Sequence, residues 1–192
     1  MDKYLQKSEY IDWDAPEILK QASLLSFDCD TDEAIARKCF EFVRDSIRHS
    51  WDYKQNPVTC RASDVLMHRT GYCYAKSHLL AALLRANRIP AGLCYQRLSV
   101  TGNGSPYSLH GFNAIFLKAF GWYRVDARGN RSDIFAEFHP PVVKLAFSCT
   151  DSNEREFPEI WADPLPEVIS VLTRSNTYIQ VYENLPDVPL KE

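Results

Sequence analysis

The first strong pattern along the chain is a helical repeat of apolar positions between residues 32 and 48. The repeat consists of Ile35, Cys39, Phe42, Val43 and Ile47. Residues at this spacing share one face of a helix, so the segment predicts an amphipathic helix over about 32–48. Asp30 or Thr31 precedes it and would cap its first turn.

The N-terminal part shows a weaker pattern. Residues 4–13 carry large apolar side chains without clear periodicity, which is typical of an extended arm packed on the body of a protein. Asp14, Pro16 and Glu17 then form a typical helix start, with a capping side chain, a proline and an acid in the first turn. A helix is therefore predicted over about 15–26.

The most apolar stretch covers residues 73–87. Its apolar positions lie almost all round a helix: Ala75, Leu79, Leu80, Ala81, Ala82, Leu83, Leu84 and Ala86. A helix of this kind is buried, and the proline of Asn87–Pro90 ends it. A short helix over about 62–69, capped by Ser63 or Asp64, is predicted to lead into it.

After residue 90 the pattern changes to the alternation of strands. Strands are predicted over residues 91–100, 110–117, 122–127 and 142–148. The second and third are joined by the short turn 118–121, so they should pair antiparallel. Pro166 and Glu167 predict a last helix through about Thr173, and the final residues are predicted to form a tail along the surface.

Composition restricts the class of protein. A chain of 192 residues with ordinary hydrophobic and charged fractions predicts one domain over residues 1–192. The net charge of −3 gives no basic footprint for nucleic acid, and no stretch has the ~20 apolar residues that span a bilayer. Without the apolar core of a signal peptide, the six cysteines are expected to be reduced in a cytoplasm. Disulfides remain the alternative if the chain is exported.

Cys73 is the first candidate for chemistry. It stands where a turn at Gly71 leads into the apolar helix, so its thiol would face unpaired backbone N–H groups and the positive end of the helix dipole. Both favour a thiolate, which makes Cys73 a candidate nucleophile. The alternative is a small core residue, because free cysteines are often buried.

His110 and Asp126 follow on the two strands of the predicted hairpin. An imidazole can serve a thiol as base or imidazolium partner, and a carboxylate can orient that imidazole. The two side chains share a face of the sheet if Phe112 lies opposite Asp126, whereas Asn113 in that place would separate them. The productive register requires a loop of odd length, or a bulge, near 118–121.

Three segments resemble the core of the transglutaminase-like superfamily. They are Gly71-Tyr72-Cys73 with its helix through Leu84-Arg85-Ala86-Asn87-Arg88-Ile89-Pro90-Ala91, His110-Gly111-Phe112-Asn113-Ala114, and Trp122-Tyr123-Arg124-Val125-Asp126-Ala127-Arg128-Gly129-Asn130. The resemblance covers about residues 31–130, and the flanks resemble stand-alone bacterial members. Phe112 departs from the tryptophan of many members, and Arg88 from a frequent glycine.

The resemblance implies an α+β, papain-like fold in which a helical N-terminal part and a buried central helix pack on an antiparallel sheet. It implies Cys73 as nucleophile, His110 as base and Asp126 as the residue that orients His110. The superfamily includes crosslinking transglutaminases, proteases, deamidating and deglycosylating enzymes and some inactive members.

Two functions are therefore expected as alternatives. The first is a cysteine acyl-transfer enzyme that forms a thioester from an amide of a protein, peptide or small molecule and passes it to water or an amine. The second is a catalytically silent module that binds a peptide in the same groove. No pattern indicates the oligomeric state. Trp51 or Gln55 could donate to an oxyanion beside the Cys73 N–H, although loop packing would also explain both.

No metal or organic cofactor is expected. The alternating acids of residues 28–33 resemble a calcium loop, but Glu33 stands at the position of its glycine and Cys39 at that of its last glutamate. The chain has no Cys-x-x-Cys, and His49, His68 and His139 have no matching cysteine or acid spacing, which argues against a zinc site. His78 is expected to be a core residue or to lie behind the site.

Overall fold

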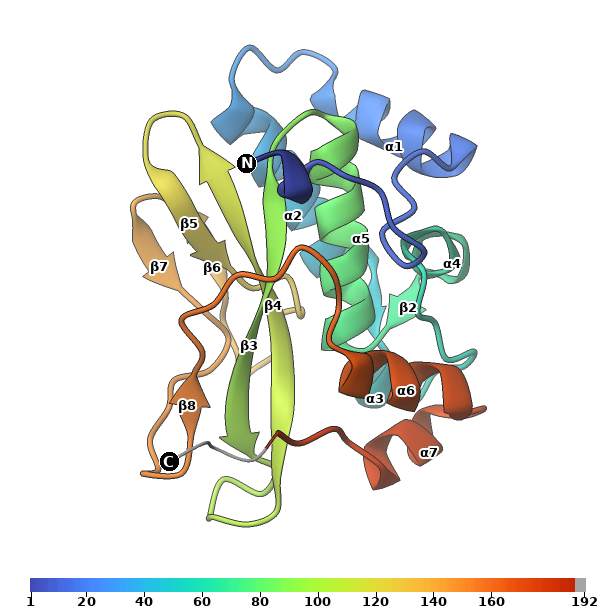
Figure 1. The fold of residues 1–192 in the computed structure, drawn as a ribbon, viewed down its shortest axis with the longest axis vertical. Coiled ribbons are helices and arrows are strands. Elements are labelled where there is room, and N and C mark those ends of the chain that lie inside the picture. The colour runs from blue at the N-terminus through green and yellow to red at the C-terminus, as the bar shows by residue number, and fades with distance from the viewer. Residues whose placement is uncertain (189–192) are drawn as a thin grey trace.

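The computed structural model describes residues 1–188 and packs a central helix, α5, between a group of helices and an antiparallel sheet (Figure 1). The helices are the 3-10 helix η1 (Asp2–Tyr4), α1 (Pro16–Ser26), α2 (Asp32–Ser46), α3 (Ser50–Tyr53), α4 (Ala62–His68), α5 (Cys73–Ala86), α6 (Pro166–Arg174) and α7 (Tyr178–Glu183). The strands are β1 (Arg48–His49), β2 (Thr70–Gly71), β3 (Ala91–Ser99), β4 (Tyr107–Leu117), β5 (Gly121–Val125), β6 (Glu137–His139), β7 (Val142–Lys144) and β8 (Arg155–Glu156). The α+β class and the buried central helix are confirmed.

Helix α5 is the core of the molecule. All its residues except Ala86 are buried, because α1, α2 and α4 cover one side and β3 and β4 the other. Its four leucines are fully inaccessible to solvent, and each contributes about 1.5–3 kcal/mol of hydrophobic stabilisation. The all-round apolar pattern of residues 73–87 therefore predicted the right environment.

A buried arginine fixes the C-terminal end of α5. The Arg85 guanidinium donates to the carbonyl oxygens of Ala91, Gln6 and Ala162, at 2.6–3.1 Å. Burial lowers the pKa of Arg85 to about 10, which still leaves it charged at neutral pH. These bonds join the N-terminal arm, the start of β3 and the connection before α6 to the central helix.

The main sheet has the strand order β5-β4-β3-β8, and all its pairs are antiparallel. Asn113 lies opposite Val125 and Leu117 opposite Gly121, so the same register places Phe112 opposite Asp126. The loop therefore has three residues, and Gly121 ends it with a φ of +74°, a conformation that suits glycine. Both the predicted register and the odd loop length are confirmed.

The predicted capping residues are right for α2 and wrong for α4. Thr31 caps α2, where its hydroxyl accepts a hydrogen bond from the Ala34 N–H at 3.1 Å. The predicted caps of α4 are wrong, because α4 begins at Ala62. Instead the Asp12 carboxylate accepts from the Ser63 N–H and hydroxyl. A residue of the distant N-terminal arm thus satisfies the first turn, which no local pattern indicates.

The Asp14 cap of α1 is also wrong. The residue in the capping position is Ala15, which offers no side-chain acceptor, and Pro16 begins the helix. Asp14 instead forms an exposed ion pair with Lys7, with 2.6 Å between Nζ and Oδ2. The missing acceptor costs little here, because proline has no N–H to satisfy.

Residues 178–188, which we call the C-terminal strap, begin with a helix that was not predicted, and the residues that follow it lie along the surface as predicted. The strap begins with α7, whose Tyr182 ring stacks on Trp51 with centroids 3.7 Å apart and an interplanar angle of 9°. The Tyr72 hydroxyl donates to the Tyr178 carbonyl at 2.6 Å. The predicted tail residues beyond 188 lie outside the described residues.

The far end of the strap is tied to the main sheet. The Leu109 N–H donates to the Pro186 carbonyl at 2.7 Å, and the Arg97 guanidinium forms two bonds of 2.7 Å with the Asp187 carboxylate. Leu109 lies on the part of β4 beyond its pairing with β5, so the strap meets an unpaired strand edge. These contacts join the strap to strands that lie far from it in the sequence, so no periodic pattern of residues predicts them.

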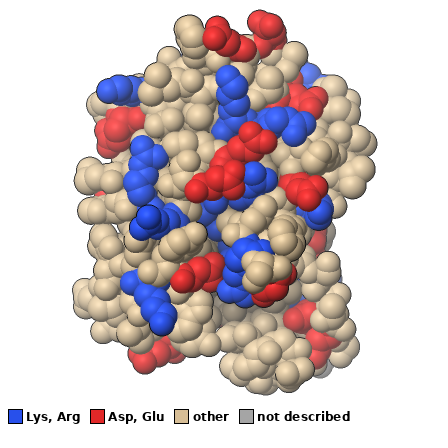
Figure 2. All heavy atoms as spheres, turned by 180° about the vertical axis from the view of Figure 1, so that it is seen from behind, with Lys and Arg blue, Asp and Glu red and all other residues tan. Residues whose placement is uncertain are grey.

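Charged side chains of both signs are interspersed on the face opposite that of Figure 1 (Figure 2). That face carries no continuous surface of one sign. Within residues 1–188, no helix combines the length and the apolar character that crossing a bilayer requires.

Candidate active site

A cleft of about 530 Å³ lies between the N-terminal end of α5 and the first half of β4. Its lining includes Cys73 and His110, together with residues from the loop after β7 and from the C-terminal strap. Aromatic and aliphatic side chains make much of its wall, including Trp51, Phe147 and Leu185. The lining also includes hydroxyl and charged side chains, so the cleft combines apolar walls with many polar groups.

Cys73 is the first residue of α5 and is 7% exposed. The turn before it is tight: a side chain at Gly71 would meet the Ala75 Cβ and the Thr59 hydroxyl at 3.1 Å. Glycine thus lets the chain pass close beneath the helix and present Cys73 to the cleft. As at any helix start, the first N–H groups of α5 have no carbonyl partner within the helix, and Cys73 belongs to this first turn.

His110 and Asp126 meet on one face of the hairpin. The His110 Nε2 lies 2.6 Å from the Asp126 Oδ2, and His110 lines the cleft together with Cys73. Asp126 is fully buried and also accepts from the N–H groups of Arg128 at 3.0 Å and Ala146 at 3.2 Å. All three residues singled out in the sequence are therefore brought together.

The electrostatics of this pair favour its charged form. Burial alone would lower the pKa of His110, but the charges of Asp126 and Cys73, with hydrogen bonds to both, raise that pKa to about 10. Burial would raise the pKa of Asp126, yet the His110 charge and three hydrogen bonds lower it. The two directions agree, and both favour a protonated His110 paired with an ionised Asp126.

Two phenylalanines hold the His110 ring. The Phe147 ring meets it edge-on at 4.9 Å, and the Phe112 ring lies nearly parallel to it at 6.3 Å. Phe112 is fully buried, so the residue that departs from the tryptophan of many relatives still packs against the imidazole. Apolar walls on both sides restrict the ring to the plane that joins Cys73 and Asp126.

The other residues considered as site candidates lie in different parts of the structure: in the cleft lining, in the core or on the surface. Trp51 lines the cleft, whereas Gln55 is absent from the described residues that line it. His78 is buried and bonds through Nδ1 to the Cys60 carbonyl at 2.8 Å, which confirms a core role. His68 and His139 are exposed on the surface.

His49 lines the cleft, and the sequence reasoning missed it. Its Nδ1 is buried without a hydrogen-bond partner and lies 3.6 Å from the Asp52 Oδ2. Asp52, three residues later in the sequence, is the signal that could have indicated it, so the statement that His49 has no matching acid spacing is wrong. Residues 48–53 form the short β1 and α3, which were predicted as loop because they are too short for periodicity.

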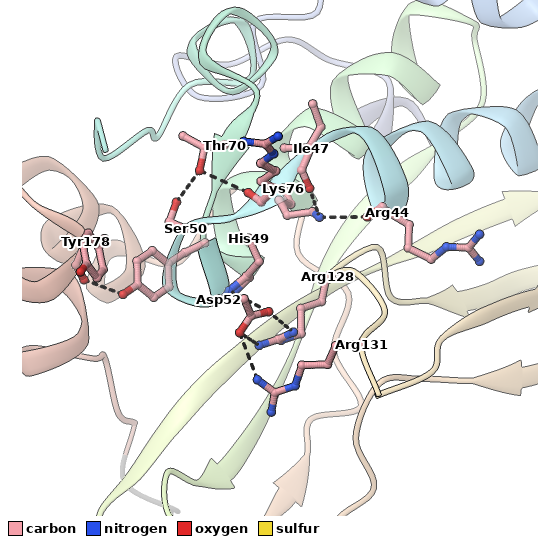
Figure 3. A network of polar contacts seen from close by, with 12 residues as sticks. Arg44, Ile47, His49, Ser50, Asp52, Thr70, Lys76, Arg128, Arg131 and Tyr178 are labelled. Carbon is pink, nitrogen blue, oxygen red and sulfur yellow. Dashed lines mark hydrogen bonds and ion pairs between the residues drawn. The ribbon is translucent and has the colours of Figure 1, made fainter. Parts of the chain in front are cut away.

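Asp52 is the centre of a charged network beside the cleft (Figure 3). Arg128 donates to both of its oxygens, at 2.7 and 3.0 Å, and Arg131 donates to Oδ1 at 3.1 Å. The Arg128 backbone N–H also bonds Asp126. Arg128 thus connects the carboxylate beside His49 with the carboxylate beside His110.

Lys76 lies one helical turn behind Cys73 and is buried (Figure 3). Its Nζ donates to the carbonyls of Ile47 at 2.5 Å and Arg44 at 3.3 Å, which end helix α2. A cation there satisfies free carbonyls and complements the helix dipole. Burial, together with the nearby Arg128 charge, lowers the pKa of Lys76 to about 7 despite the opposing charges of Asp126, Asp45 and Asp52.

Replacing Lys76 by methionine should change how stability depends on pH. The ordinary pKa of lysine is 10.5, so above about pH 7 the unfolded chain binds more protons than the folded one. Stability of the wild type therefore rises with pH through this window, by up to about 1.4 kcal/mol per pH unit. Urea unfolding of wild type and Lys76→Met between about pH 6.5 and 8.5 measures the difference.

The expected result is a difference in free energy of unfolding that moves in favour of the wild type as pH rises. Lys20→Met, which removes an exposed lysine of α1, should leave the pH dependence unchanged. A difference between wild type and Lys76→Met that stays constant over this range would contradict the lowered pKa.

The described residues, 1–188, contain no cluster of three or more histidine, cysteine, aspartate or glutamate side chains able to hold a metal ion. All six cysteines are unpaired.

Comparison with known proteins gives the same family as the motifs. A family model described as the transglutaminase-like superfamily matches residues 24–127, which overlap the predicted core of 31–130. A comparison with curated proteins gave no match.

Solved structures give similar folds at low identity. A candidate cysteine protease from Cytophaga hutchinsonii has a TM-score of 0.53 and 21% identity over 65% of this chain and 40% of its own. The periplasmic domain of TgpA from Pseudomonas aeruginosa has a TM-score of 0.48 and 22% identity over 65% and 46%. Red sea bream transglutaminase has a TM-score of 0.38 and 13% identity over 66% and 26%. The chain thus spans less than half the length of each of these proteins.

Proposed function

Because the chain belongs to the transglutaminase-like superfamily, we propose that it is a cysteine-dependent acyl-transfer enzyme acting on amide bonds. The observation that carries this proposal is a single cleft lined both by Cys73, at a helix N-terminus, and by His110, which lies 2.6 Å from the Asp126 carboxylate. Each group has the environment that its role requires: a thiol near free N–H groups, a cationic imidazole and a buried carboxylate.

In the proposed reaction, the Cys73 thiolate attacks the carbonyl carbon of an amide. The N–H groups at the start of α5 stabilise the negative oxygen that develops. His110 then gives its proton to the departing amine, and the carbon–nitrogen bond breaks to leave a thioester on Cys73. Water completes a hydrolysis and a second amine completes a transamidation. The chain's own residues supply every group in this scheme.

The cleft accommodates the side-chain amide or chain end of a protein or peptide, or a small amide. Its volume of about 530 Å³ is within the range of small-ligand pockets, and its Trp51 and Leu185 walls suit the aliphatic part of such a group. The six unpaired cysteines fit a reducing compartment, so we place the activity in the cytoplasm.

A catalytically silent binding module is the second candidate. It would use the same cleft but would need neither a reactive thiol nor a buried ion pair. Reactivity of the thiol therefore separates the two functions.

Cys73 should be the most reactive of the six thiols near pH 6. Burial raises the pKa of Cys39, Cys60 and Cys94 to about 12, and the pKa of the exposed Cys149 is also raised. Limited labelling with iodoacetamide, followed by peptide mass mapping, measures the order of reaction.

Cys149 is the internal control, since exposure alone would make it react first. Labelling of Cys149 ahead of Cys73 at pH 6 would contradict an activated thiol and favour the binding module.

A further inference from the structure

A second hollow adjoins the cleft of Cys73, and the proposed reaction has not used it. Its volume is about 690 Å³, and its described lining consists of residues 51–54, 130–131 and 178–179. These residues belong to α3 and its C-terminal end, to the loop after β5, and to α7, so we call this space the α3–α7 hollow. Trp51 and Arg131 line both the hollow and the cleft, which makes the two spaces neighbours.

Trp51 is the aromatic wall that the two spaces share. Its ring stacks on Tyr182, which lines the cleft, and its centroid lies 6.0 Å from that of Tyr178, which lines the hollow. An indole packed against two tyrosines has little freedom to move. A substrate whose reacting group occupies the cleft can therefore extend past a fixed wall into the hollow.

Large apolar side chains are exposed to solvent around the hollow. Tyr53 is 59% exposed and Ile179 is 46% exposed, and both line the hollow. Tyr182, in the wall of the neighbouring cleft, is 39% exposed. Covering apolar groups of this size with another apolar group is favourable, and a concentration of them beside a concave surface is typical of a binding site. The hollow therefore suits an apolar side chain of the substrate.

The charge around the hollow is positive. Its described lining holds two cations, Lys54 and Arg131, and one acid, Asp52, to which two arginines already bind (Figure 3). Lys54 forms no ion pair with any of residues 1–188. The same is true of Arg48, whose guanidinium lies over the Tyr53 ring at 5.5 Å from its centroid. A carboxylate at this place would meet positive charge that no acid of the described residues compensates.

We propose that the α3–α7 hollow is a specificity subsite for the peptide chain of the substrate, and this inference rests on the proposed acyl-transfer function. The subsite takes an apolar residue and an acidic residue that flank the reacting amide. The apolar side chain covers Tyr53 and Ile179, and the carboxylate lies near Lys54 and Arg48. The substrate class is then an acidic, partly apolar segment of a peptide or protein, in preference to a basic segment or an isolated small amide.

Peptide binding to Cys73→Ala tests the subsite without requiring turnover. Fluorescein-labelled peptides would share one glutamine and differ in the pair of residues beside it, which is Glu-Leu, Lys-Leu or Glu-Ser, placed on either side of the glutamine. Fluorescence anisotropy gives the dissociation constant of each peptide. On one side of the glutamine, the Glu-Leu peptide should bind at least about 5-fold more tightly than the Lys-Leu peptide, because attraction is replaced by repulsion. It should bind about 10-fold more tightly than the Glu-Ser peptide, because the leucine removes apolar surface from water.

Reversal of one charge should separate this subsite from the general charge of the molecule. Lys54→Glu, made in the Cys73→Ala protein, should remove the preference for the Glu-Leu peptide over the Lys-Leu peptide. Lys20→Glu makes the same change of charge on the exposed face of α1 and should leave the preference unchanged. Tyr53→Ala should weaken the preference for the Glu-Leu peptide over the Glu-Ser peptide and leave the charge preference in place.

Equal affinities for the Glu-Leu and Lys-Leu peptides, or a charge preference that survives Lys54→Glu, would overturn the subsite. A loss of preference in Lys20→Glu as large as that in Lys54→Glu would also overturn it, because the effect would then be one of net charge. The acyl-transfer function is tested separately, by incubating the wild type with the same peptides and following their glutamine by mass spectrometry. Peptides that bind with the expected preferences but stay unchanged would support the subsite and overturn the proposed reaction.

Discussion

Replacing Cys73 by alanine should abolish acyl transfer while changing the free energy of unfolding by no more than about 1 kcal/mol. Cys73 carries the one thiol among the described residues that line the cleft, so no residual turnover through a thioester is expected. The small stability change follows from the position of the sulfur, which lines the open cleft at the start of α5 and leaves no closed cavity when removed.

Turnover of an amide or ester substrate and thermal unfolding are the two measurements. Cys149→Ala removes an exposed thiol and should retain full activity. Unfolding of Cys73→Ala at room temperature would show that Cys73 is a structural core residue, and retained thioester formation would show that another group is the nucleophile.

Substitutions of the buried ion pair should rank in a definite order. His110→Ala removes both the proton donor and the cation beside Cys73, so it should cost more turnover than Asp126→Asn. In serine triads the aspartate-to-asparagine change lowers turnover about 10⁴-fold. Here we expect a smaller loss of turnover, because a thiolate needs less help from its base.

Asp126→Asn should also lower stability. The two carboxylate oxygens accept three hydrogen bonds, and the amide nitrogen of asparagine would face at least one donor in their place. A buried donor left unsatisfied costs about 1–3 kcal/mol. Kinetics of both variants, with unfolding measured in parallel, test the order. Full activity in both would mean that the hairpin does not carry the catalytic pair.

The hairpin shows how far local sequence pattern can place a site. The alternation of residues 110–117 and 122–127 left two registers open, and the structure has the one that places Phe112 opposite Asp126, with His110 and Asp126 on the same face. A strand has a side-chain period of two, so only one parity of register brings both groups to the same face. The predicted start of the helix over residues 73–87 likewise placed Cys73 at a helix N-terminus.

Features that depend on distant segments were not predictable in this way. Asp12 caps α4 from the N-terminal arm, and Arg128 reaches Asp52 across 76 positions of sequence. His49 entered the cleft because β1 pairs with β2, a pairing of two-residue strands. Such short elements carry no periodicity, and their geometry is set by tertiary contacts.

The C-terminal strap has a consequence for the order in which the molecule is made. Cys73, His110 and Asp126 are all synthesised before residue 178, so a nascent chain holds its reactive groups before the wall formed by Tyr182 and Leu185 exists. The bonds of Leu109 to Pro186 and of Arg97 to Asp187 can form only afterwards. Translation therefore completes the wall of the cleft after Cys73 has been made, and a chain released before the strap would carry the proposed nucleophile without that wall.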